Sequence, residues 1–253
     1  MVATANVLCD LPLPAARRTL ELVLEHSPDL VGLQEWSVRR AGLLRASGSV
    51  GLVPPLAGQL PRRLPRRGSA RPEYRWSAPL VGGCAVGARA DRYELVEATS
   101  RPVSLVGRGE NPERWWGIEP PRLMTVAVYR DQRLEGTVSV VDFHLTPGVQ
   151  ARGEYREDRP GLVARHRQEV RRVQQAVDEQ LALGRTVFAL GDSNFDGLRL
   201  AGLDSAWQGR EHEPGTHGRR RKIDDVHGPG PADAVTTLRT PSDHKAVLVR
   251  RTG

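Results

Sequence analysis

Short apolar runs alternate with longer amphipathic segments along the whole chain, without an internal repeat. Compact runs of apolar, often β-branched residues predict buried strands. The clearest are VATANVL (2–8), LVGLQEW (30–36), GGCAVGAR (82–89), RLMTVAVYR (122–130), GTVSVVDFHL (136–145), TVFAL (186–190), KIDDVHG (222–228) and KAVLVRR (245–251). Strands mixed with helices in this way predict a layered fold.

Two segments have the three- and four-residue spacing of an amphipathic helix. In residues 14–30, Leu20, Val23 and Leu24 share one face, and Ser27-Pro28 should end the helix. Residues 159–184 carry the longest stripe, and Gly184 is placed to cap its C-terminus. That stripe consists of Val163, Val170, Val173, Val177 and Leu181. Residues 46–79 are rich in Pro, Gly and Arg, and we expect a long loop there.

The composition is that of a globular protein. Of the 253 residues, 39% are hydrophobic and 26% are charged, which favours one domain over residues 1–253. The chain lacks an apolar run of membrane-spanning length and a signal-peptide pattern, so we expect a cytoplasmic protein without a membrane segment, and a monomer. Cys9 and Cys84 lack the spacing of metal ligands and are interpreted as small buried residues.

The net charge of +7 comes almost entirely from arginine, since lysine occurs only at Lys222 and Lys245. The planar guanidinium matches phosphate oxygens, so the charge favours a polyanionic partner such as nucleic acid. Arginine excess also has a plain explanation in codon composition, and basic runs such as residues 61–75 are typical of solvated loops. Charge alone therefore does not assign the partner.

Polar residues able to do chemistry stand where the predicted strands end. They are Asn6, Glu35, His144, Asp192, Asn194, Asp224, Asp243 and His244. Strand ends gather at one edge of a sheet, where residues distant in sequence can converge on a rigid support. A single aspartate or histidine at such a position is ordinarily a turn, cap or surface residue. So many of them in one chain indicate a shared site.

The motifs TANVL, DLVGLQE, DFHLTPG, LGDSNFD, KIDDV and SDHKAVLV occur in the order of the signature blocks of a known superfamily. From Asn6 to Val249 the chain resembles the endonuclease/exonuclease/phosphatase superfamily, which includes deoxyribonuclease I, exonuclease III and the inositol polyphosphate 5-phosphatases. The resemblance implies an α+β fold, a four-layer α/β/β/α sandwich of two mostly antiparallel, mixed sheets packed face to face with helices outside. It also implies a phosphoester hydrolase that depends on Mg²⁺ or Mn²⁺.

The resemblance gives the strand-end residues roles in hydrolysis. Glu35, helped by Asn6 and Asp243, would hold the cation, in keeping with the preference of hard cations for carboxylate and amide oxygens. Asp192 would orient or deprotonate the attacking water, and Asn194 would donate to the phosphoryl oxygens. Since residues two apart in an extended segment share a side, both would face the site while Ser193 turns away.

His244 would contact the phosphate, with Asp224 accepting from its other ring nitrogen, while Asp225 points to the opposite face. The resemblance leaves open whether Asp192 or His244 is the general base. His144 would be a general acid or a phosphate contact. Deoxyribonuclease I places a glutamate beside the corresponding histidine, but this chain has Gly82 or Gly83 there, so we expect His144 to lack a carboxylate partner and to be less readily protonated.

The expected substrate contacts lie in loops. Arg114, Trp115 and Arg122 combine cations with an aromatic ring that could stack on a base, although tryptophans there could equally close the edge of the core. Thr216 is a candidate phosphate contact, and Arg220 and Arg221 should lie near the mouth of the site. His212 and His217 are interpreted as exposed loop histidines, and Asp196 as a turn or N-cap residue.

Three functions fit the sequence. The favoured one is a metal-dependent phosphodiesterase that cleaves DNA or RNA. The second is a phosphatase or phosphodiesterase for a small molecule or a lipid headgroup. The third is an inactive binding module, which the complete set of site residues disfavours.

Overall fold

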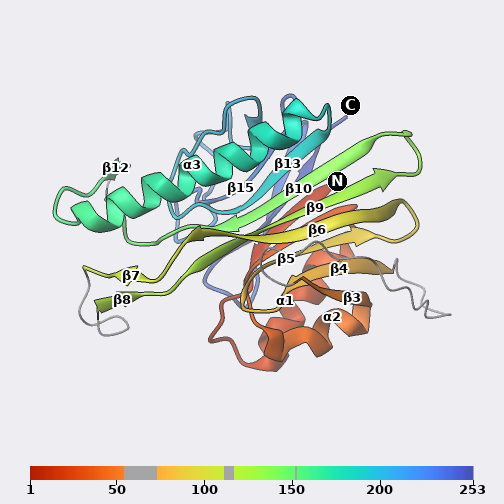
Figure 1. The fold of residues 1–253 in the computed structure, drawn as a ribbon, viewed down its shortest axis with the longest axis horizontal. Coiled ribbons are helices and arrows are strands. Elements are labelled where there is room, and N and C mark those ends of the chain that lie inside the picture. Colours follow the sequence, from red (N-terminus) through yellow and green to blue (C-terminus); the bar gives the residue numbers. More distant parts are fainter. Residues whose placement is uncertain (54–72, 111–116, 152, 253) are drawn as a thin grey trace.

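Two β-sheets pack face to face between outer helices, as the computed structural model of residues 1–53, 73–110, 117–151 and 153–252 shows (Figure 1). The first sheet has the strand order β16(Ala234–Leu238), β17(Ala246–Arg250), β1(Val2–Asn6), β2(Leu30–Trp36), β5(Gly83–Arg89), β4(Tyr74–Pro79) and β3(Gly48–Val53). The second has the order β14(Asp204–Ser205), β15(Asp224–Gly228), β13(Thr186–Asp192), β10(Thr137–His144), β9(Arg122–Asp131) and β6(Tyr93–Ser104). The expected α+β sandwich is confirmed.

The helices form the outer layers. On one side lie α1(Leu13–Glu25), the 3₁₀ turn η1(Val38–Arg40) and α2(Ala41–Ser47), and on the other lies α3(Pro160–Ala182) (Figure 1). Two small ribbons, β7(Gly107–Arg108) with β8(Ile118–Glu119) and β11(Gln150–Ala151) with β12(Glu154–Tyr155), extend from the second half of the sandwich. Gly184 follows α3 in a left-handed conformation with φ 69°, as expected of a residue that ends a helix.

The hydrophobic pattern of each element explains which surface it buries. Between the sheets, Val86 and Val247 from the first meet Val140 and Leu190 from the second in one apolar cluster. The predicted stripe of residues 20, 23 and 24 on α1 packs on the outer face of the first sheet. On α3, residues 170, 173, 177 and 181 pack on the second sheet, whereas Val163 belongs to a separate small cluster with Val149 and Leu162. Each sheet is therefore buried on both faces, which holds the strand ends rigidly.

Two parallel strand pairs direct the predicted polar residues to one edge of the sandwich. In β1 and β2, Asn6 lies opposite Gln34, and in β10 and β13, His144 lies opposite Asp192. The antiparallel strand β15 begins at the same edge, because Asp224 pairs with Asp192. The backbone register thus brings strand ends from both sheets together.

The expectation of a long loop over residues 46–79 was wrong at both of its ends. β3 and β4 pair in parallel there, and the side chains of Tyr74, Trp76 and Ala78 alternate into the core under α1 and α2. Arg75 and Ser77 separate these apolar residues, and the neighbouring Arg- and Pro-rich sequence hides a period-two pattern. Residues 54–72 lie outside the described part of the chain.

The two cysteines differ in environment. Cys84 is buried, as expected, but Cys9 is exposed, which corrects the expectation of a buried residue. Cys9 follows the end of β1, where its backbone N–H donates to Glu35 Oε2 over 2.9 Å. In the described part of the chain, we find no helix of the length and apolar character needed to cross a membrane.

Candidate functional site

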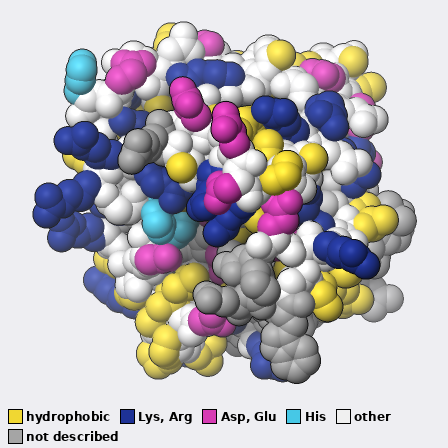
Figure 2. Space-filling view, turned by 90° about the vertical axis from the view of Figure 1, so that its left-hand side faces the viewer, with side chains coloured by type: hydrophobic (Ala, Val, Ile, Leu, Met, Phe, Trp, Pro, Cys, Tyr) yellow, Lys and Arg dark blue, Asp and Glu magenta, His cyan; other side chains and the backbone are white. Residues whose placement is uncertain are grey.

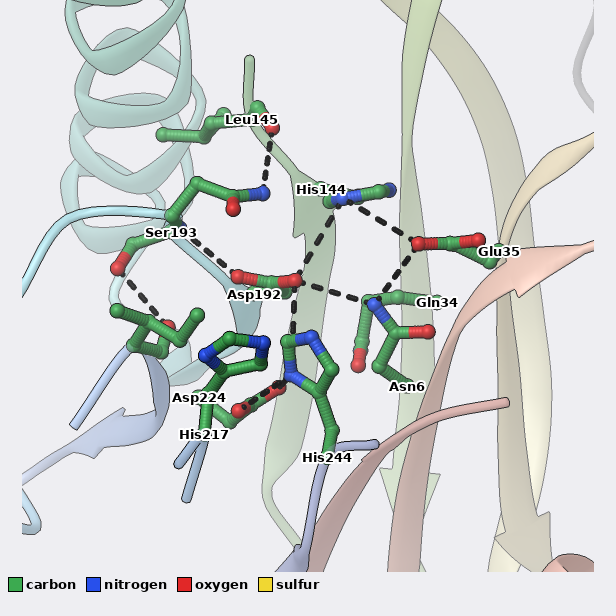
Figure 3. A network of polar contacts seen from close by, with 12 residues as sticks. Asn6, Gln34, Glu35, His144, Leu145, Asp192, Ser193, His217, Asp224 and His244 are labelled. Atoms are coloured by element: carbon green, nitrogen blue, oxygen red, sulfur yellow. Dashed lines mark hydrogen bonds and ion pairs between the residues drawn. The ribbon is translucent and has the colours of Figure 1, made fainter. Parts of the chain in front are cut away.

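Four of the predicted residues meet where the two sheets end (Figure 3). Asn6 Nδ2 lies 3.1 Å from Glu35 Oε1 and 3.1 Å from Asp192 Oδ2, so one amide joins carboxylates from both sheets. His144 Nε2 lies 3.5 Å from Asp192 Oδ2 and 3.9 Å from Glu35 Oε1. Residues separated by up to 186 positions in the sequence thus form one polar cluster.

Asp192 is at the centre of this cluster and is fully buried. Its Oδ1 accepts the backbone N–H of Asn194 over 2.8 Å, while Oδ2 faces Asn6 and His144. Burial and the nearby charge of Asp224 raise the pKa of Asp192 to about 7, against the opposing effects of His244 and two hydrogen bonds. A carboxyl with this pKa can both accept and release a proton near neutral pH.

His244 and Asp224 form a buried ion pair beside Asp192. His244 Nδ1 lies 2.8 Å from Asp224 Oδ2 and 3.8 Å from Asp192 Oδ2. Burial disfavours the imidazolium, but the hydrogen bond and charge of Asp224, together with Asp192, outweigh it and raise the pKa of His244 to about 9. The ring is therefore positively charged at neutral pH, and its Nε2 lies 3.9 Å from Asp243 Oδ1.

Glu35 is held by a break in β2. The pairing of β2 with β5 shifts between Leu33 and Trp36, and Glu35 has a positive φ of 56°. Burial opposes its charge, but the charge of His144 and hydrogen bonds from Cys9 and Asn6 lower the pKa of Glu35 to about 2. The bulge thus aims an ionised carboxylate at the cluster.

The loop after β13 confirms the predicted orientation of Ser193 but not that of Asn194. Ser193 turns away, and its hydroxyl contacts the backbone oxygens of Phe195 and Ile223 at 2.7 and 2.9 Å. Asn194 adopts φ 51°, and its Nδ2 donates to Leu145 O over 3.0 Å. In this structure its side chain therefore braces the end of β10.

Gly191, just before Asp192, permits this packing. A Cβ at this position, where φ is 153°, would lie 2.0 Å from Phe143 O on β10. Only glycine allows so close an approach of the two strands that carry His144 and Asp192.

The expectation that His144 lacks a carboxylate partner was wrong. The glycines at the start of β5 supply no acid, but Glu35 and Asp192 lie within 3.9 and 3.5 Å of its Nε2. The partners come from β2 and β13. The sequence comparison considered only the position at the start of β5, so it could not reveal partners that come from other strands.

His217 was also misjudged. Its ring centroid lies 4.8 Å from that of His244, and its backbone bridges both Arg221 and His244. Burial and the charges of His244 and Arg221 lower the pKa of His217. It is a half-buried neighbour of the site, whereas His212 is exposed, as expected.

Several neighbours have structural partners. Thr216 is buried and accepts the N–H of Asp224 over 3.2 Å, so it supports the start of β15. Asp225 points to the opposite face, as expected, and receives the hydroxyl of Ser205 at 2.5 Å. Asp196 lies in a turn without a following helix, and its backbone N–H donates to Gln150 at 2.8 Å. Asp196 is therefore a turn residue and not an N-cap.

Asp243 stands apart from the other two expected cation ligands. Its carboxylate is 54% exposed and lies 3.9 Å from His244 Nε2 and 3.7 Å from His217 Nε2. Contacts run in a chain from Glu35 to His144, Asp192 and His244, and Asp243 is the last residue of that chain, at the opposite end from Glu35. Two triplets in the described chain have mutually close ligand atoms: Asp192, Asp224 and His244, and His217, Asp243 and His244.

The expected substrate contacts are dispersed. Arg122 lies behind the site, with Nη1 3.5 Å from His144 O. Arg220 is exposed and Arg221 is half-buried, with its backbone oxygen accepting the N–H groups of Thr216 and His217. Arg114 and Trp115 lie outside the described residues.

Helix α3 contributes two residues that the sequence reading passed over. His166 Nε2 lies 2.7 Å from Ser193 O, and Glu169 accepts the N–H of Thr146 over 2.7 Å. They anchor the loops that follow β13 and β10. Both fall on the buried face of α3. Polar residues within an otherwise apolar helical stripe could therefore have indicated that these two side chains have buried partners.

The chain is similar to several solved structures along nearly its whole length. The structure of D. rerio TDP2 complexed with a single-strand DNA product has 16% identity and a TM-score of 0.62, and the match covers 98% of this chain and 96% of that one. An endonuclease/exonuclease/phosphatase family protein from Bacteroides thetaiotaomicron has 16% identity and a TM-score of 0.63, with 98% and 92% covered. The human Nocturnin catalytic domain with bound sulfate has 15% identity and a TM-score of 0.61, with 98% and 91% covered.

Sequence comparison gives no such match, because neither a family model nor a curated protein matches the chain. At 15–16% identity, the likeness to solved structures establishes the fold and no more.

Proposed function

We propose that this chain, which has the fold of the endonuclease/exonuclease/phosphatase superfamily, is a divalent-metal-dependent hydrolase that cleaves phosphodiester bonds in DNA or RNA. The observation that carries the proposal is the Asp192 cluster, in which a carboxyl of pKa about 7 lies between two histidines, one of them held as imidazolium by Asp224. These are the groups that hydrolysis of a phosphoester needs: a base for water and positive charge for the phosphoryl oxygens.

The residues at the Glu35 end of the cluster fit a hard divalent cation. Glu35 is ionised, with a pKa of about 2, and it adjoins the amide of Asn6 and the carboxyl of Asp192. Mg²⁺ and Mn²⁺ prefer such oxygen donors. The triplet of Asp192, Asp224 and His244 fits less well, because Asp224 and His244 already bond each other at 2.8 Å. When bound beside Glu35 and Asn6, the cation would neutralise charge on the phosphoryl oxygens.

The protein groups divide the remaining work. Asp192 accepts the proton of the attacking water, because its raised pKa matches neutral pH. His244, kept protonated by Asp224, donates from Nε2 to a phosphoryl oxygen as negative charge builds. His144, on the opposite side of Asp192, is placed to contact the phosphate or to protonate the leaving oxygen.

Nucleic acid is the substrate class that the charge and the fold both favour. The net charge is +7, and Lys and Arg side chains flank the hollow that holds histidine and acidic side chains at this end of the molecule (Figure 2). The similar D. rerio TDP2 structure contains a single-strand DNA product. Cationic side chains beside a hydrolytic site suit a polyanionic strand.

The test is cleavage of plasmid DNA and of single-stranded RNA by the purified protein in Mg²⁺ or Mn²⁺. We expect cleavage that a chelator abolishes and that Glu35→Ala loses, because the cation then lacks its main ligand. Glu21→Ala is the matched control, since it removes an exposed glutamate from α1. If neither polymer is cleaved while inositol, sugar or nucleotide phosphates release phosphate, the nuclease proposal fails in favour of a small-molecule phosphoesterase.

A further inference from the structure

A second hollow adjoins the site on the far side of His244. It has a volume of about 460 Å³ and lies between the loop of residues 214–219 and the segment of residues 239–245. His244 and Asp243 belong to its lining. Its size falls within the range of pockets that hold small ligands, so a sugar phosphate can enter.

Three cationic side chains line this pocket: Arg219, Arg239 and Lys245. Lys245 Nζ donates to Gly215 O over 2.8 Å, which ties the two walls together. Arg219 and Arg239 form no ion pair with any other residue that the structure describes. Asp243 is the one acidic residue among the described lining residues, so the pocket carries a positive excess.

The walls of the pocket are braced by backbone bonds. Thr240 Oγ1 donates to His244 O over 2.9 Å, and Gly215 N donates to Arg219 O over 3.2 Å. A third bond, from Lys245 N to Thr216 O at 2.9 Å, fixes the loop against the start of β17. The arginine side chains therefore extend from a fixed rim.

His244 forms the partition between this pocket and the Asp192 cluster. Its Nδ1 is bonded to Asp224 inside the cluster, and its Nε2 lies 3.9 Å from Asp243 on the pocket side. A phosphate contacted by His244 Nε2 would therefore lie beside the lining of the pocket, within reach of a neighbouring group of the same ligand inside it.

We propose that the pocket binds a second, non-reacting phosphate of the substrate, held by Arg219 and Arg239. The inference rests on the proposed function and narrows it to substrates that carry two phosphates in close succession. Guanidinium groups match phosphate oxygens in shape and charge. Such a pair of phosphates occurs both along a nucleic-acid strand and in a small bisphosphate.

The test compares substrates that differ in their second phosphate. Bis(p-nitrophenyl) phosphate has one phosphate, whereas thymidine dinucleotides can carry an additional phosphate at the 5′ end, the 3′ end or neither. Myo-inositol 1,4-bisphosphate represents the small molecules. The double variant Arg219→Ala/Arg239→Ala is measured against Arg17→Ala/Arg171→Ala, which removes two exposed arginines from α1 and α3.

We expect the pocket variant to lower kcat/KM by tenfold or more for substrates with the second phosphate, about the effect of losing charged hydrogen bonds. For bis(p-nitrophenyl) phosphate we expect a change of less than about twofold, and for the control variant no loss with any substrate. A loss confined to terminally phosphorylated dinucleotides identifies a strand as the source, and a loss confined to the inositol compound identifies a small bisphosphate. An equal loss for all substrates, or no loss for any, overturns the inference.

Failure of the proposed function is distinguishable from failure of the pocket. If no substrate is hydrolysed with either metal, calorimetry still compares thymidine 3′,5′-bisphosphate with thymidine 5′-monophosphate. Tighter binding of the bisphosphate that the pocket variant abolishes supports the pocket. Equal affinities overturn it.

Discussion

Glu35 and Asn194 both hold a left-handed backbone, with φ of 56° and 51°, at the edge of the Asp192 cluster. Such a conformation costs a side-chain-bearing residue about 1–3 kcal/mol and persists where the surroundings enforce it. Bonds from Cys9 N to Glu35 and from Asn194 Nδ2 to Leu145 O provide that enforcement. Local strain thus accompanies the orientation of two proposed functional residues.

Replacement of Asp192 tests the proposed base. Asp192→Asn keeps the shape of the side chain but cannot accept the proton, so we expect kcat to fall by about 10²–10⁴-fold. Initial rates on the best substrate give the measurement. Asp196→Asn is the control, because Asp196 contacts Gln150 only through its backbone, and it should keep full activity. Comparable rates for both variants would contradict the assignment.

The Asp224 carboxylate should set the protonation of His244. In the metal-free protein, we expect the His244 ring to titrate near pH 9, and in Asp224→Asn at a clearly lower pH, because burial then opposes the imidazolium without the Asp224 carboxylate. NMR titration of the ring protons measures both values. Asp225→Asn changes the neighbouring carboxyl on the opposite face and should leave the titration where it was. An unchanged pKa in Asp224→Asn would refute the ion pair.

The same pair makes stability depend on pH. Because the folded pKa of His244 lies above its ordinary value of 6.5, its contribution is complete below about pH 6.5 and is lost as pH rises through about 9. Urea unfolding between pH 6 and 10 should therefore show a decline in the free energy of unfolding that Asp224→Asn reduces. An identical decline in both proteins would contradict this origin.

Single residues were predictable only where a motif fixed them. The contact between Asp224 and His244 was predicted because the resemblance places the family's aspartate one residue after Ile223. The place of His217 beside the site was not predicted. It depends on backbone bridges to Arg221 and His244, and no pattern in the sequence around His217 reveals these bridges. The partners of His144 likewise come from two other strands.

At the scale of elements, α3 acts as a clamp on the two strands that carry the cluster. Glu169 is fully buried and accepts bonds from Ser104, Thr146 and Arg165 at 2.6, 2.7 and 3.2 Å. His166 holds Ser193 from the same face, one turn earlier. The helix therefore fixes the loops after β10 and β13 through polar bonds within an apolar interface.

Removal of Glu169 should be costly. Glu169→Ala leaves the nearby Arg165 without its buried partner, and we expect the free energy of unfolding to fall by about 3–5 kcal/mol. Glu179→Ala, on the exposed face of the same helix, breaks the surface pair with Arg101 and an exposed hydrogen bond from Gln175, and should cost at most about 1 kcal/mol. Chemical denaturation compares the two. Equal effects would argue against the clamp.

Elements with a regular pattern were predicted, and those with an interrupted pattern were missed. The strands corresponding to β2, β10 and β13 and the helix α3 follow long periodic runs. β6 was not expected, because two register shifts and Pro102 disturb its alternation. The edge strand β16 is only half-buried, so its sequence carries little hydrophobic signal.

At the scale of the whole molecule, the charge of +7 should govern binding to a strand. We expect the logarithm of the affinity of metal-free Glu35→Ala for single-stranded DNA to fall linearly with the logarithm of salt concentration, with a slope of about −0.7 per neutralised phosphate. Fluorescence anisotropy from low to high salt gives the slope. Affinity that is independent of salt would exclude the basic surface as the binding face.

The amide of Asn6 bonds one carboxylate in its own sheet and another in the opposite sheet. The site is therefore a seam, and it exists only while the two halves of the sandwich are docked. Whatever binds there draws both sheet edges together, so occupancy should slow hydrogen exchange in β2 and in β13 alike. The proposed activity then requires that both sheets are packed together. A ligand or substitution that separates the sheets would abolish the proposed activity even if each sheet stayed folded.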